Sequence, residues 1–178
     1  MIDYRDLLAR IEPRGEPSIL DGFAATLERC VAHAELNTPL RLAHFLAQAS
    51  EESDGLHTTV EYASGQAYEG RRDLGNIHPG DGPRFKGRGL IQLTGRFNYH
   101  AYGAALGLDL VANPELAAQF PAAAMIAAEY WRQRGLNRFA DHDDVRGVTL
   151  RVNGGENGLA NRKRYLMRAK SALAMASE

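Results

Sequence analysis

One glycine-rich segment limits the folds that this 178-residue chain can adopt. Between residues 65 and 89, glycine stands at positions 65, 70, 75, 80, 82, 87 and 89. Glycine costs backbone entropy in a helix and favours turns, so this segment cannot form a regular helix. We predict one long loop or a short hairpin there. Loops of that length in compact domains are usually functional or disordered.

The rest of the chain carries apolar residues at helical spacing. Tyr4, Leu7, Leu8 and Ile11 follow a candidate N-cap, Asp3. Further helical patterns cover residues 23–34, 42–54, 97–106, 121–134, 143–152 and 159–174. No alternating strand pattern competes with them, and we find no repeat. The sequence therefore predicts a single, mainly α-helical domain over residues 1–178.

Composition excludes several classes of protein. Hydrophobic residues make up 44% and the net charge is −1, so no global field attracts nucleic acid or anionic lipid. The single cysteine, Cys30, lies on an apolar helical stripe, and we expect a buried thiol. No segment has about 18 uncharged apolar residues, and the N-terminus is charged where a signal peptide is apolar. We expect synthesis in the cytoplasm without a signal peptide, and no integral membrane segment.

Glu52 is the first candidate for chemistry. Rotation by about 100° per residue places it near Phe45 and Ala49, on the apolar stripe of its helix. Partial burial and a helix C-terminus both favour the protonated form of a carboxyl group, which is the form that a general acid requires. The alternative is a frayed last turn before Asp54 and Gly55, with Glu52 in solvent.

A second carboxylate, Glu61, follows closely enough to fold back toward Glu52. Two carboxyl groups suffice for glycoside hydrolysis, one protonating the leaving oxygen and the other activating water or attacking the sugar. Spacing alone also fits a surface residue.

The segment DGPRFKGRGLIQLTGRFNYH excludes two nucleotide motifs. Arg88 and Gly89 stand where a phosphate-binding loop needs lysine and a hydroxyl residue, and Gln92 replaces the third glycine of a dinucleotide fingerprint. What remains is a glycine turn followed by a polar row of Gln92, Thr94 and Asn98. These side chains suit hydrogen bonds to sugar hydroxyls or to a water molecule.

Four stretches of the chain resemble the family 19 glycoside hydrolases, the chitinase-like enzymes that include many phage and prophage endolysins. They are HFLAQASEESDGL, YEGRRDLGNIHPGDGPRFKGRGLIQLTGRFNY, NPELA and VTLRVNGGENGLANRKRY, in the order of the family. The resemblance implies a lysozyme-like helical fold and an inverting mechanism in which a base activates water.

The resemblance also implies roles for individual residues. Glu52 matches the general acid and Glu61 the general base. Gln92, Thr94, Asn98, Asn153 and Arg162 match residues that bind substrate, position water or lie near the acid. Glu156 is a candidate third acidic residue of that network.

Two features depart from the family pattern or compete with it. Glu51 replaces the histidine that usually precedes the acid and adds a negative charge there. Glu69 is an alternative base, although the family spacing favours Glu61.

The other polar candidates have simpler explanations. The six histidines lack zinc spacing, and Asp141, Asp143 and Asp144 lack the pattern of a calcium loop and suit helix capping. We expect no cofactor and no metal. The basic residues from Arg162 to Lys170 suit a solvated helix face or weak attraction to an anionic envelope.

We therefore expect an endolysin-type hydrolase that cleaves the β-1,4 bond between N-acetylmuramic acid and N-acetylglucosamine in peptidoglycan. It would act as a monomer on the cell wall after release by a separate system. The alternatives are a chitinase and a non-catalytic glycan-binding module.

Overall fold

The computed structural model describes residues 2–175, and helices dominate them. The α-helices are α1 (Tyr4–Ile11), α2 (Pro17–His33), α3 (Pro39–Glu52), α4 (Asp81–Arg84), α5 (Arg96–Leu106), α6 (Ala122–Gln133), α7 (Asn137–Ala140), α8 (Val145–Asn153) and α9 (Leu159–Met175). Three 3-10 helices are η1 (Gln66–Tyr68), η2 (Arg72–Leu74) and η3 (Pro114–Ala118). Strand pairing in the described residues is limited to two isolated bridges. The predicted fold class is confirmed.

Local sequence signals explain where the main helices begin. The Asp3 side chain accepts hydrogen bonds from the first turn of α1, and Thr38 caps α3 in the same way. Of the three aspartates expected to cap helices, Asp144 accepts a hydrogen bond from the first turn of α8, and Asp141 occupies the C-cap position of α7 while its side chain pairs with Arg41. Asp143 pairs with two basic side chains, so for this residue the capping prediction is wrong. Its side-chain partners lie far away in sequence.

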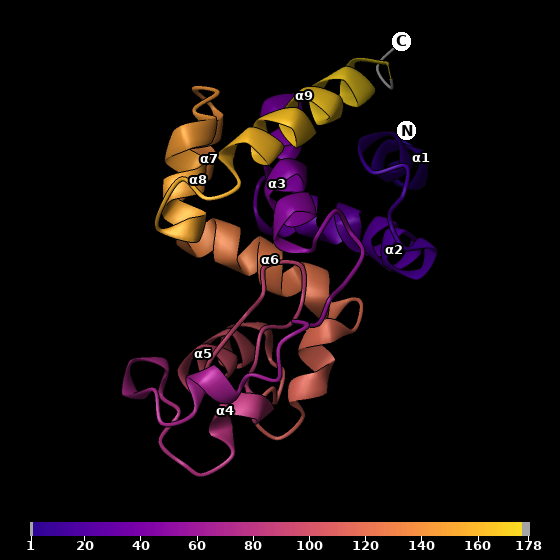
Figure 1. The fold of residues 1–178 in the computed structure, drawn as a ribbon. Helices are drawn as coiled ribbons and strands as arrows, with labels where there is room; N and C mark the ends of the chain where they lie inside the picture. Colours follow the sequence, from indigo (N-terminus) through magenta and orange to yellow (C-terminus); the bar gives the residue numbers. More distant parts are fainter. Residues whose placement is uncertain (1, 176–178) are drawn as a thin grey trace.

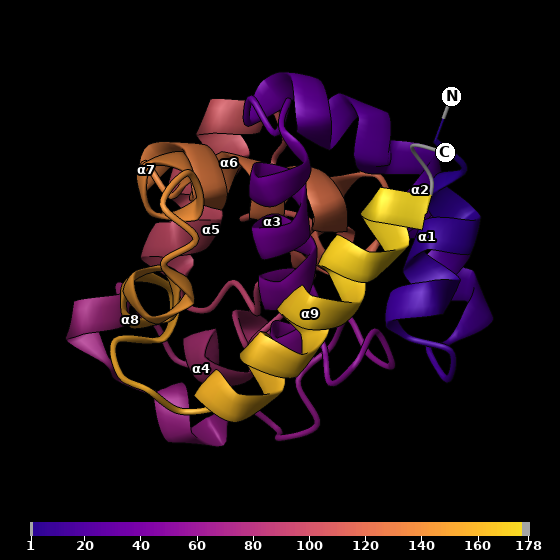
Figure 2. The ribbon, with the colours of Figure 1, turned by 90° about the horizontal axis from the view of Figure 1, so that it is seen from above.

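Helix α3 lies at the centre of the molecule, with α9, α2, α6, α7 and α8 around it (Figure 2). Its residues from Leu42 to Ser50 are all buried. The sequence predicted one apolar stripe on this helix, because small residues such as Ala43 and Ala47 carry little amphipathic signal. They are buried because neighbouring helices approach on every side.

Two apolar cores are joined by α6. The larger core contains Leu8, Phe23, Phe45 and Trp131 among others, and Cys30 is fully buried in it, as expected. Burial raises the pKa of this thiol to about 12. The smaller core is built around Phe85, Tyr99, Leu110 and Ile126. In Figure 1, α1, α2, α3 and α9 form the upper part of the molecule, α4 and α5 the lower part, and α6 runs between them.

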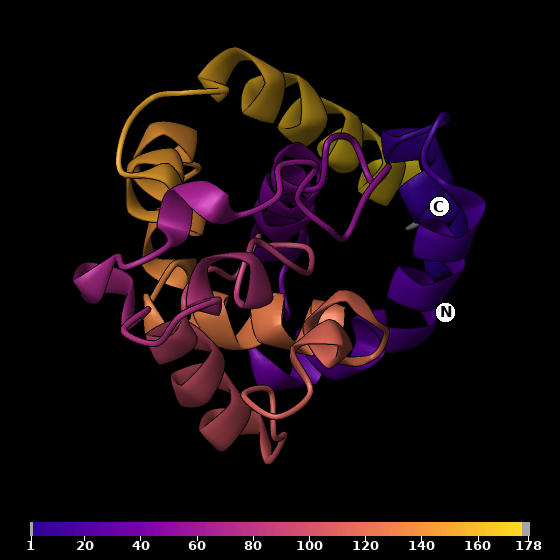
Figure 3. The same ribbon diagram turned by 60° about the horizontal axis from the view of Figure 1, so that its bottom comes forward.

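The glycine-rich segment is more structured than a single loop or hairpin. It contains η1, η2 and α4, separated by turns. Buried Asp81 in α4 pairs with Arg96, which ties the segment to α5. Figure 3 shows this magenta segment on the face from which the end of α3 is also seen. No helix in residues 2–175 is long and apolar enough to cross a membrane.

Candidate active site

An open cleft of about 530 Å³ lies between the two parts of the molecule. The residues that line it are Glu52, Tyr68, Leu74, Ile91, Gln92, Leu93, Thr94, Asn98, Tyr102, Tyr130, Arg134, Val152 and Asn153. They come from α3, α5, α6, α8 and the glycine-rich segment with its continuation to residue 98. The cleft therefore brings together side chains that are far apart in sequence.

Glu52 is the last residue of α3, and a buried arginine holds its carboxylate. Arg162 donates from Nη2 to Glu52 Oε1 over 2.5 Å, and the two side chains are 2% and 18% exposed. Arg162 also donates from Nη1 to Gln48 Oε1, one turn earlier on α3. Glu52 is therefore ordered at the cleft surface, and the alternative of a freely solvated last turn is wrong. Arg162 contacts Glu52 through Oε1, and no described residue is recorded as a hydrogen-bond partner of Oε2.

Glu51, which precedes Glu52 on α3, is not among the residues that line the cleft. Its carboxylate packs against Gly158, where an added Cβ would stand 2.1 Å from Glu51 Oε1. Burial raises the pKa of Glu51, and the charge of Glu52 acts in the same direction, while Arg162 opposes both. Arg162 therefore binds Glu52 directly and attracts the neighbouring Glu51 carboxylate electrostatically.

Glu61 is held in place by backbone pairing and by both of its carboxylate oxygens. The bridge between Val60 and Arg88 is extended by a hydrogen bond from Glu61 N to Gly87 O at 2.9 Å. Glu61 Oε1 accepts from the Tyr68 hydroxyl, and Oε2 accepts from Gly87 N, each at 2.9 Å. Glu61 does not itself line the cleft, but Tyr68 does. The predicted base therefore borders the cleft through Tyr68.

The alternative base, Glu69, has a structural role in this molecule. Its two oxygens accept from Gly80 N at 2.7 Å and from Gly82 N at 2.8 Å, and it does not line the cleft. The third acidic candidate, Glu156, forms an exposed ion pair with Arg146 at 2.5 Å. Neither carboxylate contacts Glu52.

The predicted polar row lies along one wall of the cleft. Gln92, Thr94 and Asn98 all line it, and each is fixed by a hydrogen bond to a backbone carbonyl. The backbone of Gln92 has a positive φ of 52°, a left-handed conformation that is uncommon for a residue with a side chain. Asn153, at the end of α8, lines the cleft as well. Four of the five predicted binding residues therefore line the cleft, and Arg162 lies behind Glu52.

Sequence reasoning missed an aromatic and cationic part of the cleft. Tyr102 of α5 stacks on Tyr130 of α6, with ring centroids 6.2 Å apart. The Arg134 guanidinium lies over the Tyr130 ring, 4.1 Å from its centroid. Both tyrosines sit at helical spacing among apolar residues, so the pattern indicated core positions. Only the packing of α5 against α6 reveals that they reach the cleft.

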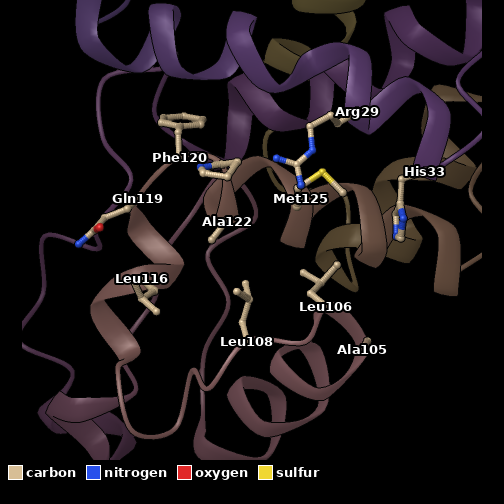
Figure 4. A pocket seen from close by; sticks show the side chains of 11 residues that line it. Arg29, His33, Ala105, Leu106, Leu108, Leu116, Gln119, Phe120, Ala122 and Met125 are labelled. Atoms are coloured by element: carbon tan, nitrogen blue, oxygen red, sulfur yellow. The ribbon is translucent and has the colours of Figure 1, made fainter.

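A second pocket, of about 420 Å³, lies between α2, α6 and the end of α5. Figure 4 shows Leu106, Leu108 and Met125 lining it, with Arg29 and His33 contributed by α2. No carboxylate is among the described residues that line this pocket. It cannot supply an acid and base pair, so the cleft at Glu52 is the candidate active site.

Two further groups of polar residues serve the fold. Buried His44 pairs with Asp143, and His33 pairs with Glu129. Among residues 2–175, no three potential ligands are grouped to hold a metal ion. In the C-terminal basic cluster, Arg162 is buried, Arg168 pairs with Glu12 and Lys170 with Asp143.

Comparison with known proteins identifies relatives of this chain. The family model for class I chitinase matches residues 20–153. A family 19 glycosyl hydrolase domain-containing protein from Haemophilus influenzae is 38% identical over 103 residues, which are 57% of this chain and 49% of that protein. Chitinase 11 from rice is 39% identical over 105 residues, 58% of this chain and 40% of that protein.

The fold has solved counterparts. The crystal structure of chitinase C from Streptomyces griseus superposes with a TM-score of 0.77 at 25% identity, covering 97% of this chain and 76% of that one. A class IV chitinase from Zea mays shares the fold with a TM-score of 0.71 at 18% identity, over 96% and 90% of the two chains. The matched regions span about half or less of the length of the two curated relatives.

Proposed function

The chain belongs to the family 19 glycoside hydrolases, the class I chitinase family, and from this premise we propose that it hydrolyses β-1,4 linkages in an N-acetylhexosamine polymer. The observation that carries the proposal is the fixed carboxyl group of Glu52 in an open cleft. Arg162 occupies Oε1, so Oε2 is the oxygen that delivers a proton to the glycosidic oxygen.

The reaction then needs a water molecule and a base. Glu61 accepts a proton from a water molecule. At the same time the water oxygen bonds to the anomeric carbon, and the bond from that carbon to the leaving oxygen breaks. The hydrogen bonds from Tyr68 and Gly87 orient the Glu61 carboxylate. Each carboxylate oxygen has two lone pairs, so Glu61 can accept a further hydrogen bond from the water molecule. Attack from the face opposite the leaving group inverts the anomeric configuration. Afterwards, solvent returns the proton from Glu61 to Glu52.

For the substrate, we propose peptidoglycan, cleaved between N-acetylmuramic acid and N-acetylglucosamine, and the physiological role of an endolysin. The support is a cation in the cleft, Arg134, where a neutral glycan would need none. In this role the enzyme would reach the wall after release by a separate system. Chitin is the second candidate, because relatives such as chitinase 11 from rice are named as chitinases.

Paired assays on purified peptidoglycan and on chitin test the substrate. We expect reducing ends to be released from peptidoglycan, whereas hydrolysis of chitin alone would reject the endolysin role. Turnover of neither polymer, with both bound, would favour a glycan-binding module.

Replacing Glu52 tests the mechanism. Glu52→Gln keeps the shape of the side chain but loses the transferable proton, so we expect turnover to fall by at least about a hundredfold. Circular dichroism and polymer binding should remain near those of the wild type. Activity close to that of the wild type would reject Glu52 as the acid.

The anomer released by the wild type tests Glu61. Proton NMR of the first product should show the inverted anomer, because Glu61 activates water instead of forming a covalent intermediate. A retained anomer would reject this role.

A further inference from the structure

Arg134 places a fixed positive charge in the cleft. It follows the last residue of α6, one turn after Tyr130, and its guanidinium lies over the Tyr130 ring. Tyr102 supports that ring from the other helix. Burial raises the pKa of Tyr130 to about 12, so the ring carries a neutral hydroxyl at neutral pH. The aromatic pair therefore holds a cation in a defined place through cation–π attraction.

Within residues 2–175, no carboxylate forms an ion pair with Arg134. Neighbouring Arg132 pairs with Glu129, and Arg162 pairs with Glu52, whereas Arg134 takes part in no ion pair there. Arg134 is also exposed, unlike Arg162. Among the described residues that line the cleft, it is the sole cation. An arginine remains charged at any working pH, so the cleft offers its ligand a guanidinium that interacts with tyrosine side chains and has no carboxylate partner.

The two candidate polymers differ in the feature that such a group recognises. Chitin is a chain of neutral N-acetylglucosamine units. The muramic acid of peptidoglycan carries a lactyl ether, which ends in a carboxylate or is extended by a peptide stem that bears carboxylates. A guanidinium binds a carboxylate through two parallel hydrogen bonds and gives little advantage with a neutral sugar.

We propose that Arg134, held by Tyr102 and Tyr130, is a specificity-determining residue that binds a carboxylate on the lactyl substituent of the glycan. This inference rests on the proposed glycosidase function and names the substrate chemistry of the same cleft. Arg134 then selects anionic glycans over neutral ones, whereas Glu52 and Glu61 act on the linkage that both polymers share.

The test compares charged and neutralised forms of one polymer. Stem-free glycan strands are assayed before and after their lactyl carboxylates are converted to methylamides, and stem-bearing strands are treated in the same way. We expect the wild type to show kcat/KM about tenfold higher on the charged form, which a solvent-exposed pair of a guanidinium and a carboxylate can provide. Added salt should reduce that preference.

Variants of Arg134 assign the preference to this side chain. In Arg134→Gln the ratio of kcat/KM between charged and neutralised strands should fall toward one, and Arg134→Lys should keep part of it. Arg138→Gln is the matched control, because Arg138 lies on α7 against Phe139 and outside the cleft lining. It should keep the wild-type ratio. A preference confined to stem-bearing strands would identify the stem as the source of the carboxylate.

Two outcomes separate the inference from the function on which it rests. Equal ratios in the wild type and Arg134→Gln would overturn the role of Arg134 while leaving the hydrolase intact. If the wild type cleaved chitin alone, the peptidoglycan proposal would fail. Binding of the charged and neutralised strands would then be measured with Glu52→Gln and with the double variant Glu52→Gln/Arg134→Gln. A preference for charged strands in Glu52→Gln that is lost in the double variant would support the inference. Absence of that preference in Glu52→Gln would overturn it.

Discussion

Arg162 links the residues around the predicted acid. A buried guanidinium needs a carboxylate and further hydrogen-bond acceptors, because an unpaired charge is expensive inside a protein. Glu52 provides the carboxylate, and Gln48 provides an amide oxygen. Glu51 lies near the same guanidinium with its own pKa raised by burial. Glu52 and Glu51 therefore lie beside the same buried cation.

Removing the charge of Glu51 should alter the pH dependence of stability. Burial raises the pKa of Glu51, so this carboxyl group costs the folded protein stability once the pH rises above the ordinary pKa of a glutamate. Glu51→Gln should therefore raise the free energy of unfolding at pH 7 and leave it nearly unchanged at about pH 4. Urea unfolding at both pH values measures the change, and Glu28→Gln, an exposed change on α2, should have little effect at either. An equal change at both pH values would contradict the role of this charge.

At this scale, sequence identified residues whose role follows from a local motif. Glu52 lies on a helical face, and Gln92, Thr94 and Asn98 follow a glycine turn, so all four could be placed at a site. Gln48 and Tyr68 were missed, because their importance depends on Arg162 and Glu61, which reach them by tertiary folding. Arg134 was missed for the same reason, because only the folded structure shows that it lines the cleft without a carboxylate partner.

At the scale of elements, the long helices were predictable and the short ones were not. Patterns over residues 97–106 and 159–174 correspond closely to α5 and α9, since apolar periodicity is a local property. Helices α4 and α7 have four residues each, too few to show a period. They form because long-range contacts hold their ends, as Arg96 holds Asp81 in α4.

The turn at Gly87 can lie close to Gln92 and Glu61 because glycine has no side chain. A Cβ there would stand 2.8 Å from Gln92 Oε1 and 3.1 Å from Glu61 Oε2. Gly87→Ala should therefore displace two predicted site residues, and we expect kcat/KM to fall about tenfold or more with the protein still folded. Reducing-end assays and thermal unfolding measure the two effects.

Gly70 supplies the opposite case in the same segment. It has a positive φ of 69° and nothing within 4 Å of an added Cβ. Gly70→Ala should cost roughly 1 kcal/mol of stability through backbone strain while keeping activity. If Gly87→Ala also lost only stability, the turn would have no special relation to Glu61 and Gln92.

At the scale of the whole molecule, α6 connects the two cores that border the cleft. Its residues Ala127 and Trp131 pack in the larger core, while Ile126 packs in the smaller one. Glu129 is buried on this helix, where Arg132 binds both of its oxygens and His33 of α2 binds one. This carboxylate therefore fixes α2 against the helix that spans both parts.

The stability of the molecule should consequently depend on the ionisation of Glu129. Hydrogen bonds, first of all from Arg132, lower the pKa of Glu129 from 4.5 to about 2. A lowered folded-state pKa gives stability that is complete above about pH 4.5 and is lost as pH falls toward 2. Glu129→Gln should lower the free energy of unfolding by roughly 2 kcal/mol at pH 7, after allowance for the half-exposed Arg132.

Urea unfolding at pH 7 and at about pH 3.5 measures this change. The difference between the wild type and Glu129→Gln should shrink at the lower pH, because the wild-type carboxylate there begins to lose the advantage of its lowered pKa. Glu115→Gln, an exposed change in η3, should show a small difference at both values. A difference for Glu129→Gln that stayed constant or grew as pH fell would mean that the packing of the side chain, and not its charge, holds α2 against α6.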